Sequence, residues 1–198
     1  SILLLIIAFV FQFSNTKRLY KLDKKDGLRF SQRIKNIISN HHILSQKLDW
    51  LHFGFGTMVF HRENVAQAIG AKMAVSFRGF DIGIYPLKNP NCYDKLWAKV
   101  NKIHVISDDI QELIYQQGCD KNVKITKITP AIDVSFFEQS EVKSLNSNNI
   151  LTIARLHWKK GLTYTLMALK QLKEKGINFH YSIVGEGEAF EKLMYIRH

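Results

Sequence analysis

Short apolar runs alternate with helix-like segments through the first two thirds of the chain. The runs occupy residues 47–53, 72–77, 102–107 and 123–128. Each run has the length of a strand, whereas apolar residues recur at helical spacing in segments that lie between runs. Runs of this kind are typical of strands that are buried on both faces of a parallel sheet. The pattern therefore predicts an α/β domain built on a parallel sheet.

Glycine and serine residues mark the expected ends of two helices. A helix over residues 57–69 is followed by Gly70, a residue type that favours the left-handed conformation at a helix C-terminus. Ser107 is a suitable N-cap for a helix expected at residues 108–117, which ends before Gly118.

Two polar segments are expected to be loops. Residues 17–29 are charged and contain Gly27, and residues 78–91 are rich in Gly, Pro and Asn. The segments that follow them, 30–38 and 92–100, are expected to be helical.

The strand–helix alternation stops and then restarts near the end of the chain. Residues 138–149 contain many Ser and Asn and few bulky side chains, so we expect an interdomain linker there. Beyond it the pattern predicts a strand at 150–154, a helix at 163–175, a strand at 179–184 and the start of another helix. We therefore expect a first domain at 1–137 and the beginning of a second at 150–198.

The first 13 residues are almost entirely apolar. They are too few for a helix that spans a bilayer, which takes about 20 residues. They also lack the basic segment and the cleavage site of a signal peptide. We expect a buried helix or strand in a chain whose beginning is missing, with a membrane-surface anchor as the alternative.

The chain is strongly basic, with a formal net charge of +11. This charge favours polyanionic partners, which include nucleic acid, an anionic membrane and phosphorylated ligands. Cys92 and Cys119 show no metal-binding or redox spacing, so we expect two reduced thiols.

Two cations follow the strand predicted at 150–154. Arg155 ends this strand and Lys160 lies in the next loop, just before Gly161 and a helix. Ligands of parallel sheets bind beyond the carboxyl ends of the strands, and a helix N-terminus attracts anions. A forked guanidinium, an ammonium and free backbone N–H groups together predict a diphosphate cradle. The alternative is two solvated surface cations.

A glycine pair follows the strand predicted at 179–184. Gly185 and Gly187 resemble the start of a dinucleotide-binding fingerprint, but Phe190 stands where the third glycine should be. This argues against a nicotinamide cofactor. Two interpretations stay open, a close approach of the backbone to a nucleotide and a tight turn.

Two further candidates follow the earlier strands. Arg78 lies just beyond the run at 72–77, where it either faces a ligand or pairs with Asp81. His52 lies at the end of the run at 47–53 and is either catalytic or structural.

Several chemistries lack the residues that they need. His41 and His42 are adjacent and point apart, and no Cys/His cluster has ligand spacing, so we expect no metal site. A serine-hydrolase elbow and a phosphate-binding P-loop are also missing from the 198 residues.

Four segments in order then resemble a known family: "KIHVISDDIQELIYQQG", "ITPAIDVSFF", "ILTIARLHWKKGL" and "FHYSIVGEGE". They are similar to the retaining glycosyltransferases of family 4, the glycosyltransferase group 1 type. "LDWLHFGFG" and "VSFRGFDI" are similar to the bacterial branch that builds exopolysaccharides such as colanic acid.

The resemblance implies a fold and a reaction. The fold is α/β with two facing Rossmann-like domains, termed GT-B, of which the first lacks its start and the second is truncated. The reaction is transfer of a hexose-type sugar, with retention and without metal or cofactor, from a nucleotide-diphosphate sugar to a glycan or lipid-linked acceptor. Arg155 and Lys160 would hold the donor diphosphate, with backbone at Gly161, Gly185 and Gly187 lining the donor cleft. Arg78 and His52 would serve the reacting centre.

Three positions depart from the family's usual pattern. Ala154 and Ala131 stand where glycines are common, and both are small enough to keep the backbone conformation. Arg78 stands where many relatives carry a histidine, so a histidine role cannot be carried over to that position.

The resemblance also sets expectations for the whole protein. We expect a cytoplasmic protein, with peripheral contact to an anionic membrane left open. We expect the 198 residues alone to be inactive, since a family carboxylate motif is missing. A sugar-nucleotide 2-epimerase that uses Asp81, Glu186 and His52 is the alternative enzyme. A nucleic-acid-binding module is disfavoured because basic residues are scattered and no recognition motif occurs.

Overall fold

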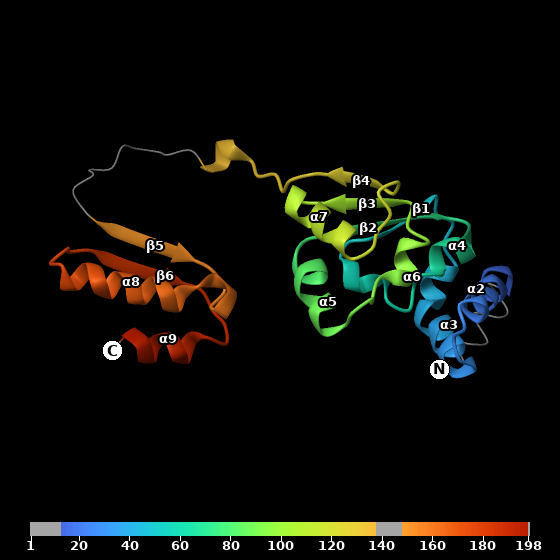
Figure 1. Ribbon diagram of the computed structural model, residues 1–198, viewed down its shortest axis with the longest axis horizontal. Helices are drawn as coiled ribbons and strands as arrows, with labels where there is room; N and C mark the ends of the chain where they lie inside the picture. Colours follow the sequence, from blue (N-terminus) through green and yellow to red (C-terminus); the bar gives the residue numbers. More distant parts are fainter. Residues whose placement is uncertain (1–12, 138–147, 198) are drawn as a thin grey trace. The chain divides into compact units, whose positions relative to one another are not determined.

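The computed structural model describes residues 13–137 and 148–197 (Figure 1). By its internal contacts the chain divides into two compact units, residues 1–132 and residues 133–198. We describe each unit by itself. The predicted linker at 138–149 lies almost entirely outside the described residues, as does the apolar stretch before Phe13. Among the described residues, no helix is long and apolar enough to cross a membrane.

Unit 1 is built on a four-stranded parallel sheet. Its strands pair in the order β1-β2-β3-β4, which is also their order in the sequence. The bounds are β1 Trp50–Phe53, β2 Lys72–Phe77, β3 Lys102–Val105 and β4 Lys124–Lys127. All four strands lie within the predicted runs, so the predicted α/β class with a parallel sheet is confirmed.

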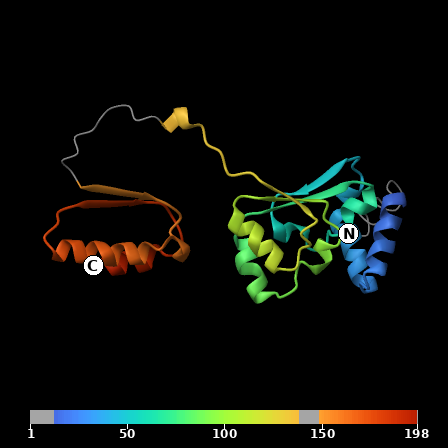
Figure 2. The same ribbon diagram turned by 45° about the horizontal axis from the view of Figure 1, so that its top comes forward.

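Only one face of this sheet is apolar, which corrects the expectation of strands buried on both faces. The helices of unit 1 gather on one side of the sheet in both views (Figures 1 and 2). Toward this side the strands contribute fully buried side chains such as Val75, Ile103 and Val105. Most strand positions between the buried apolar residues are polar, among them His52, Ser76 and His104. The runs are short, and this period-two alternation is easily overlooked in them.

Among the described residues, helices α2 (Phe13–Lys25) and α3 (Phe30–Leu44) precede the sheet. The loop predicted at 17–29 is therefore wrong, because helix α2 continues to Lys25. Leu19 is buried against Ile37 and Leu44 of α3, whereas most of the lysines of α2 are exposed. A helix with one narrow apolar stripe and many charges has the composition of a loop, which explains the error.

A buried carboxylate ties these helices together. Asp23 of α2 accepts hydrogen bonds from the side-chain amides of Asn36 at 2.9 Å and Asn64 at 2.8 Å. Lys99 forms an ion pair with Asp26, which follows α2. Because buried polar groups need partners, this network fixes α2 against α3 and the segment before α4.

The other helices of unit 1 are shorter than predicted. The segment 57–69 forms a 3-10 turn (Gly56–Val59) and then α4 (Val65–Ile69), closed by Gly70 in the left-handed conformation at φ 80°. The later helices are α5 (Tyr85–Lys88), α6 (Asp94–Trp97) and α7 (Asp108–Gln116). Ser107 caps α7 as predicted, with its hydroxyl accepting from the Ile110 N–H at 3.4 Å.

The segment predicted as a loop at 78–91 is largely helical. A π-helical turn at Phe80–Ile84 leads directly into α5. Asp81 in this turn is 0% exposed and accepts backbone N–H groups from Gly56 at 2.9 Å, Arg78 at 3.0 Å and Gly79 at 2.9 Å. Tyr93 donates its hydroxyl to the Asp81 carbonyl at 2.7 Å. Asp81 therefore joins the segments that follow β1 and β2.

Unit 2 contains two parallel strands and two longer helices. The bounds are β5 Asn149–Ile153, α8 Leu162–Glu174, β6 His180–Val184 and α9 Phe190–Arg197. Short 3-10 turns occur at Val134–Phe137 and Trp158–Lys160. The predicted strand–helix–strand order is confirmed in this unit.

The two chain segments beyond β5 and β6 lie in close backbone contact. Ala154 N–H donates to the Val184 carbonyl at 3.0 Å, and Leu156 N–H donates to the Glu186 carbonyl at 2.8 Å. A Cβ atom at Gly185 would lie 1.8 Å from the Ala154 carbonyl oxygen, and one at Gly187 would lie 2.4 Å from the Leu156 oxygen. Glycine is required at both positions because no side-chain atom fits there.

Removing the Asp81 carboxylate should destabilise unit 1. Asp81→Ala leaves the backbone N–H groups of Gly56, Arg78 and Gly79 without their buried acceptor, and we expect a loss of about 3 kcal/mol of unfolding free energy. Urea denaturation followed by tryptophan fluorescence measures this, because Trp97 is 9% exposed in the same core. Glu112→Ala, on an exposed position of α7, is the control and should change little. Equal stability of both variants would contradict the assigned role.

Adding a methyl group at Gly187 should destabilise unit 2. The new Cβ overlaps the Leu156 carbonyl and the φ of 152° is strained for an L-residue, so we expect a cost of about 3 kcal/mol. Hydrogen exchange of the amides in β5 and β6, read by mass spectrometry, measures it. The matched control is Gly176→Ala, at φ 79° with no atom within 4 Å of its Cβ, which should cost only about 1 kcal/mol. Similar exchange in the two variants would refute the packing argument.

Candidate functional site

Arg155 is held by the backbone contact between the two segments of unit 2. It lies between Ala154 and Leu156, and the N–H groups of both these neighbours bond to the segment after β6. Leu156 is buried at 4% exposure, whereas the Arg155 side chain is exposed. The backbone at Arg155 is therefore fixed while its guanidinium can reach a ligand.

Lys160 lies in the 3-10 turn that leads into α8. Its N–H donates to the His157 carbonyl at 2.9 Å, and the Gly161 N–H donates to the Trp158 carbonyl at 3.0 Å. Gly161 adopts a left-handed conformation at φ 67° and has no side chain with which to cap α8. The first N–H groups of the helix are thus left without a side-chain acceptor, and the positive end of the helix dipole lies beside Lys160 in sequence.

Arg155 and Lys160 are both exposed and free to bind a ligand. Across residues 13–137 and 148–197, neither the Arg155 guanidinium nor the Lys160 ammonium has a hydrogen-bond or ion-pair partner. A pair of unpartnered cations near a helix N-terminus can bind an anionic group such as a diphosphate.

Two neighbouring residues were not predicted. His157 accepts the Lys159 N–H on Nδ1 at 3.2 Å, and its Nε2 lies 3.5 Å from a Glu188 carboxylate oxygen. Trp158 is 68% exposed and tilts against the His157 ring, with centroids 5.6 Å apart. His157 thus connects the turn before α8 to the segment after β6. The exposure of the indole could not be inferred from sequence, because tryptophan in an apolar context is usually buried.

The glycines at 185 and 187 have a clear structural role. The tight approach of the two backbones accounts for both residues, which favours the structural interpretation of this pair. Their N–H groups remain candidates for contact with a ligand, and that role is not tested by the packing.

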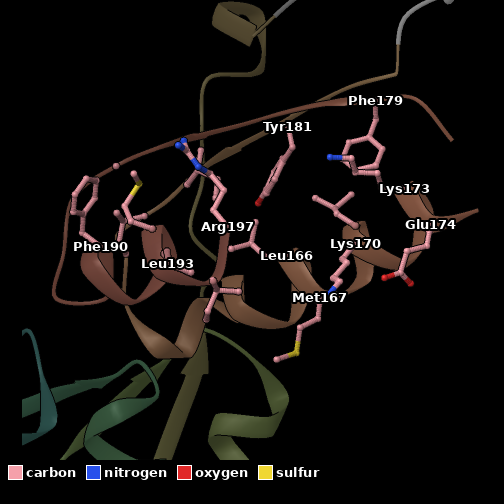
Figure 3. A pocket seen from close by; sticks show the side chains of 16 residues that line it. Leu166, Met167, Lys170, Lys173, Glu174, Phe179, Tyr181, Phe190, Leu193 and Arg197 are labelled. Atoms are coloured by element: carbon pink, nitrogen blue, oxygen red, sulfur yellow. The ribbon is translucent and has the colours of Figure 1, made fainter. Parts of the chain in front are cut away.

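An apolar groove of about 970 Å³ also lies in unit 2 (Figure 3). Side chains of α8, β6 and α9 line it, among them Leu166, Tyr181 and Leu193. Gly185 lies at the groove, whereas Arg155, Lys160 and Gly161 are not part of its lining. The groove and the two cations are therefore separate features of this unit.

In unit 1 the predicted residues lie near the carboxyl ends of neighbouring strands. His52 is the third residue of β1, Arg78 directly follows β2, and both side chains are exposed. The Arg78 guanidinium does not pair with Asp81, which instead accepts the backbone N–H of Arg78. Because Asp81 is fully buried and used by backbone donors, it is not available as an acid or base in a cleft.

His52 belongs to a hydrogen-bonded row that the sequence did not reveal. Its Nε2 lies 2.8 Å from the Ser76 hydroxyl on β2, which lies 2.9 Å from Nδ1 of His104 on β3. His104 Nε2 lies 3.1 Å from the Ile128 carbonyl, just after β4. Ser76 and His104 directly face each other in the strand register. Finding the row requires this register, and one sequence does not give it.

Metal and thiol chemistry have little support in the described part of the chain. Among residues 13–137 and 148–197, no group of three or more His, Cys, Asp or Glu side chains could hold a metal ion. Burial raises the pKa of the Cys119 thiol to about 11, and it also raises the pKa of Cys92. A raised pKa lowers the thiolate fraction, so neither cysteine has the character of a nucleophile.

Comparisons with known proteins relate parts of the chain to glycosyltransferases. Residues 133–197 match the family model described as glycosyl transferases group 1. WcaL of Escherichia coli (strain K12), named for colanic acid biosynthesis, is 31% identical over 145 residues, which are 72% of this chain and 36% of that protein. AmsK of Erwinia amylovora, named as an amylovoran biosynthesis glycosyltransferase, is 27% identical over 147 residues with the same coverage of 72% and 36%.

A solved structure also aligns with the chain. It is the pneumococcal O-GlcNAc transferase GtfA in complex with UDP and GlcNAc, at 21% sequence identity and a TM-score of 0.48. The alignment covers 82% of this chain and 34% of that one.

The family model and the curated relatives confirm the resemblance to group 1 glycosyltransferases and to the colanic acid branch, whereas family 4 membership and retention stay predictions. The chain spans 36% of the length of the curated relatives, so the comparisons describe part of such a protein. Residues 133–197 belong to a glycosyltransferase group 1 domain, and the chain is a homologue of the colanic acid and amylovoran biosynthesis glycosyltransferases.

Proposed function

We propose that the complete protein is a retaining, family 4 glycosyltransferase of bacterial surface polysaccharide biosynthesis. It transfers a hexose from a nucleotide-diphosphate sugar to a glycan or lipid-linked acceptor. The observation that carries this proposal is the pair of exposed, unpartnered cations, Arg155 and Lys160, in the segment between β5 and α8. Both lie inside the segment that matches the family model.

The two cations have a defined task in this reaction. When the sugar leaves, negative charge grows on the diphosphate of the leaving nucleotide. A guanidinium that can bind two oxygens and a nearby ammonium offset this charge, and the helix dipole adds to them. Such fixed positive groups stabilise the transition state electrostatically, so we propose that transfer proceeds without a metal ion.

The backbone of unit 2 supports this donor site. Glycines at 161, 185 and 187 lie in the segments that follow β5 and β6, where parallel sheets bind ligands. We propose that the backbone at these glycines lines the donor cleft. Unit 2 would then belong to the donor-binding domain and unit 1 to the acceptor-side domain.

Unit 1 offers two side chains to an acceptor. We propose that His52 and Arg78 meet the acceptor near the carboxyl ends of β1 and β2, where both are exposed. The buried Asp81 weakens the alternative of a 2-epimerase, because that reaction needs carboxylates that are free to move protons.

The proposal extends to the setting of the enzyme. We propose that it acts in the cytoplasm, at the inner face of the plasma membrane, where its charge of +11 favours anionic lipid. We also propose that the 198 residues bind a nucleotide without turning over a donor, since they span 36% of the relatives' length.

Removing both cations should weaken nucleotide binding by the chain. Loss of two charge-assisted contacts in Arg155→Ala plus Lys160→Ala should lower the affinity for UDP by on the order of tenfold or more. Isothermal titration calorimetry at fixed salt measures it. Lys175→Ala plus Lys192→Ala removes two exposed charges elsewhere in unit 2 and is the matched control. If the two double variants bind UDP equally well, the diphosphate site lies elsewhere.

Chelation should leave this binding unchanged. Because protein cations neutralise the diphosphate in our proposal, UDP affinity in EDTA should equal that measured without EDTA. The titration is repeated with added Mg²⁺ as the comparison. A loss of affinity in EDTA that Mg²⁺ restores would refute metal independence.

A further inference from the structure

The row His52–Ser76–His104 allows the proton positions to be deduced. The Ile128 carbonyl can only accept a hydrogen bond, so Nε2 of His104, at 3.1 Å, must carry a proton. In a neutral His104 the other nitrogen, Nδ1, then has a lone pair. It accepts the hydroxyl proton of Ser76 across 2.9 Å.

This use of the Ser76 proton decides the state of His52. A hydroxyl has one proton, so Ser76 can only accept a hydrogen bond from His52. Nε2 of His52, at 2.8 Å, is therefore the protonated nitrogen, and Nδ1 carries the lone pair. Within the described parts of the chain, Nδ1 of His52 has no hydrogen-bond partner, and the residue is exposed.

We propose that Ser76 and His104 are positioning residues that hold His52 in its Nε2–H tautomer, so that Nδ1 accepts a hydrogen bond from a sugar hydroxyl of the acceptor. The hydroxyl part of this proposal rests on the proposed function, whereas the tautomer follows from the row itself. An imidazole lone pair repels anions, so this position recognises a neutral hydroxyl donor and complements the cationic donor site.

The surroundings of Ser76 support a fixed arrangement. Ser76 is 1% exposed, so water does not compete for its hydroxyl. It lies on the central part of the sheet, between β1 and β3, and its partners come from both neighbouring strands. The anchor at the far end is a backbone carbonyl, which cannot change its role. The Ile128 carbonyl thus determines which atom donates in each hydrogen bond of the row, including the bond from His52 to Ser76.

Nitrogen NMR of the 198-residue chain tests the tautomer directly. The ¹⁵N shifts of a neutral histidine ring differ between its two tautomers, so the spectrum shows which ring nitrogen carries the proton. His52 should show a pure Nε2–H pattern. His180 has no side-chain partner among the described residues and serves as the reference for an averaged histidine in the same spectrum.

Variants test whether Ser76 and His104 cause this tautomer of His52. Ser76→Ala and His104→Ala should each move the ¹⁵N shifts of His52 toward the averaged values of His180. Ser76→Thr keeps a hydroxyl, so this variant should keep the pure Nε2–H pattern. Ser45→Ala is the matched control, because Ser45 is an exposed serine that bonds only within its own helix end. If Ser76→Ala does not fold, His104→Ala and Ser76→Thr carry the same comparison. An averaged His52 in the unmodified chain would overturn the proposal, as would shifts that neither removal variant changes.

Two probes then test the class of ligand. Glucose, a donor of hydroxyl groups, should shift His52 Nδ1 more than it shifts His180, whereas inorganic phosphate should not shift it. A phosphate shift, or equal effects of glucose on both histidines, would overturn the hydroxyl assignment. Because no nucleotide is present, these results are independent of the UDP titrations that test the donor site.

Discussion

The buried carboxylate of Asp81 is the contact on which the site of unit 1 depends. Loops beyond strand ends are ordinarily mobile, since they have few partners. Here one side chain accepts backbone N–H groups from the segments after β1 and after β2, at 2.9 to 3.0 Å. Each N–H that it satisfies would otherwise be costly in the core. Arg78 and the loop after His52 thereby gain a rigid support without using their own side chains.

Unit 2 reaches the same result by a different contact. Its two strand-end segments bond to each other directly, and glycine at 185 and 187 allows the backbones to approach. Neither Arg155 nor Lys160 contributes a side chain to this contact. In both units hydrogen bonds to backbone N–H groups fix the segments after the strands. The side chains of Arg78, Arg155 and Lys160 take no part in these bonds. Groups that are fixed before the ligand arrives need little reorganisation, which is what makes electrostatic stabilisation effective.

The sequence predicted the strands better than the helices or the site. Runs such as 72–77 and 102–107 contain alternate buried residues, and glycine at 70 and 118 ends helices for a conformational reason. Helix α2 was missed because its single apolar stripe is hidden among lysines. The Asp81 contacts were missed because a carboxylate near an arginine suggests an ion pair, and nothing local indicates that it is buried.

The candidate site residues also differ in whether local sequence could predict them. Arg155 and Lys160 could be proposed from sequence because their position after a strand and before a helix is a local property. The partners of His52 could not, since Ser76 and His104 are 24 and 52 residues away along the chain. Only the strand register brings them together, with Ser76 directly opposite His104. Motifs therefore indicate candidate ligand-binding residues that one loop provides, whereas side-chain contacts built across strands appear only once the sheet is known.

The polar face of the sheet explains how unit 1 can carry such a row. In a parallel sheet covered on both faces, a chain of histidine and serine would have to be buried completely, with each polar atom paired. In unit 1 the buried apolar side chains occupy alternate strand positions, and most of the positions between them hold lysine, histidine, serine or threonine. His104 and His52 can then be partly exposed while the Ser76 between them stays dry. The same period-two pattern that was overlooked in the short runs thus gives the sheet a face that can carry a row of polar side chains.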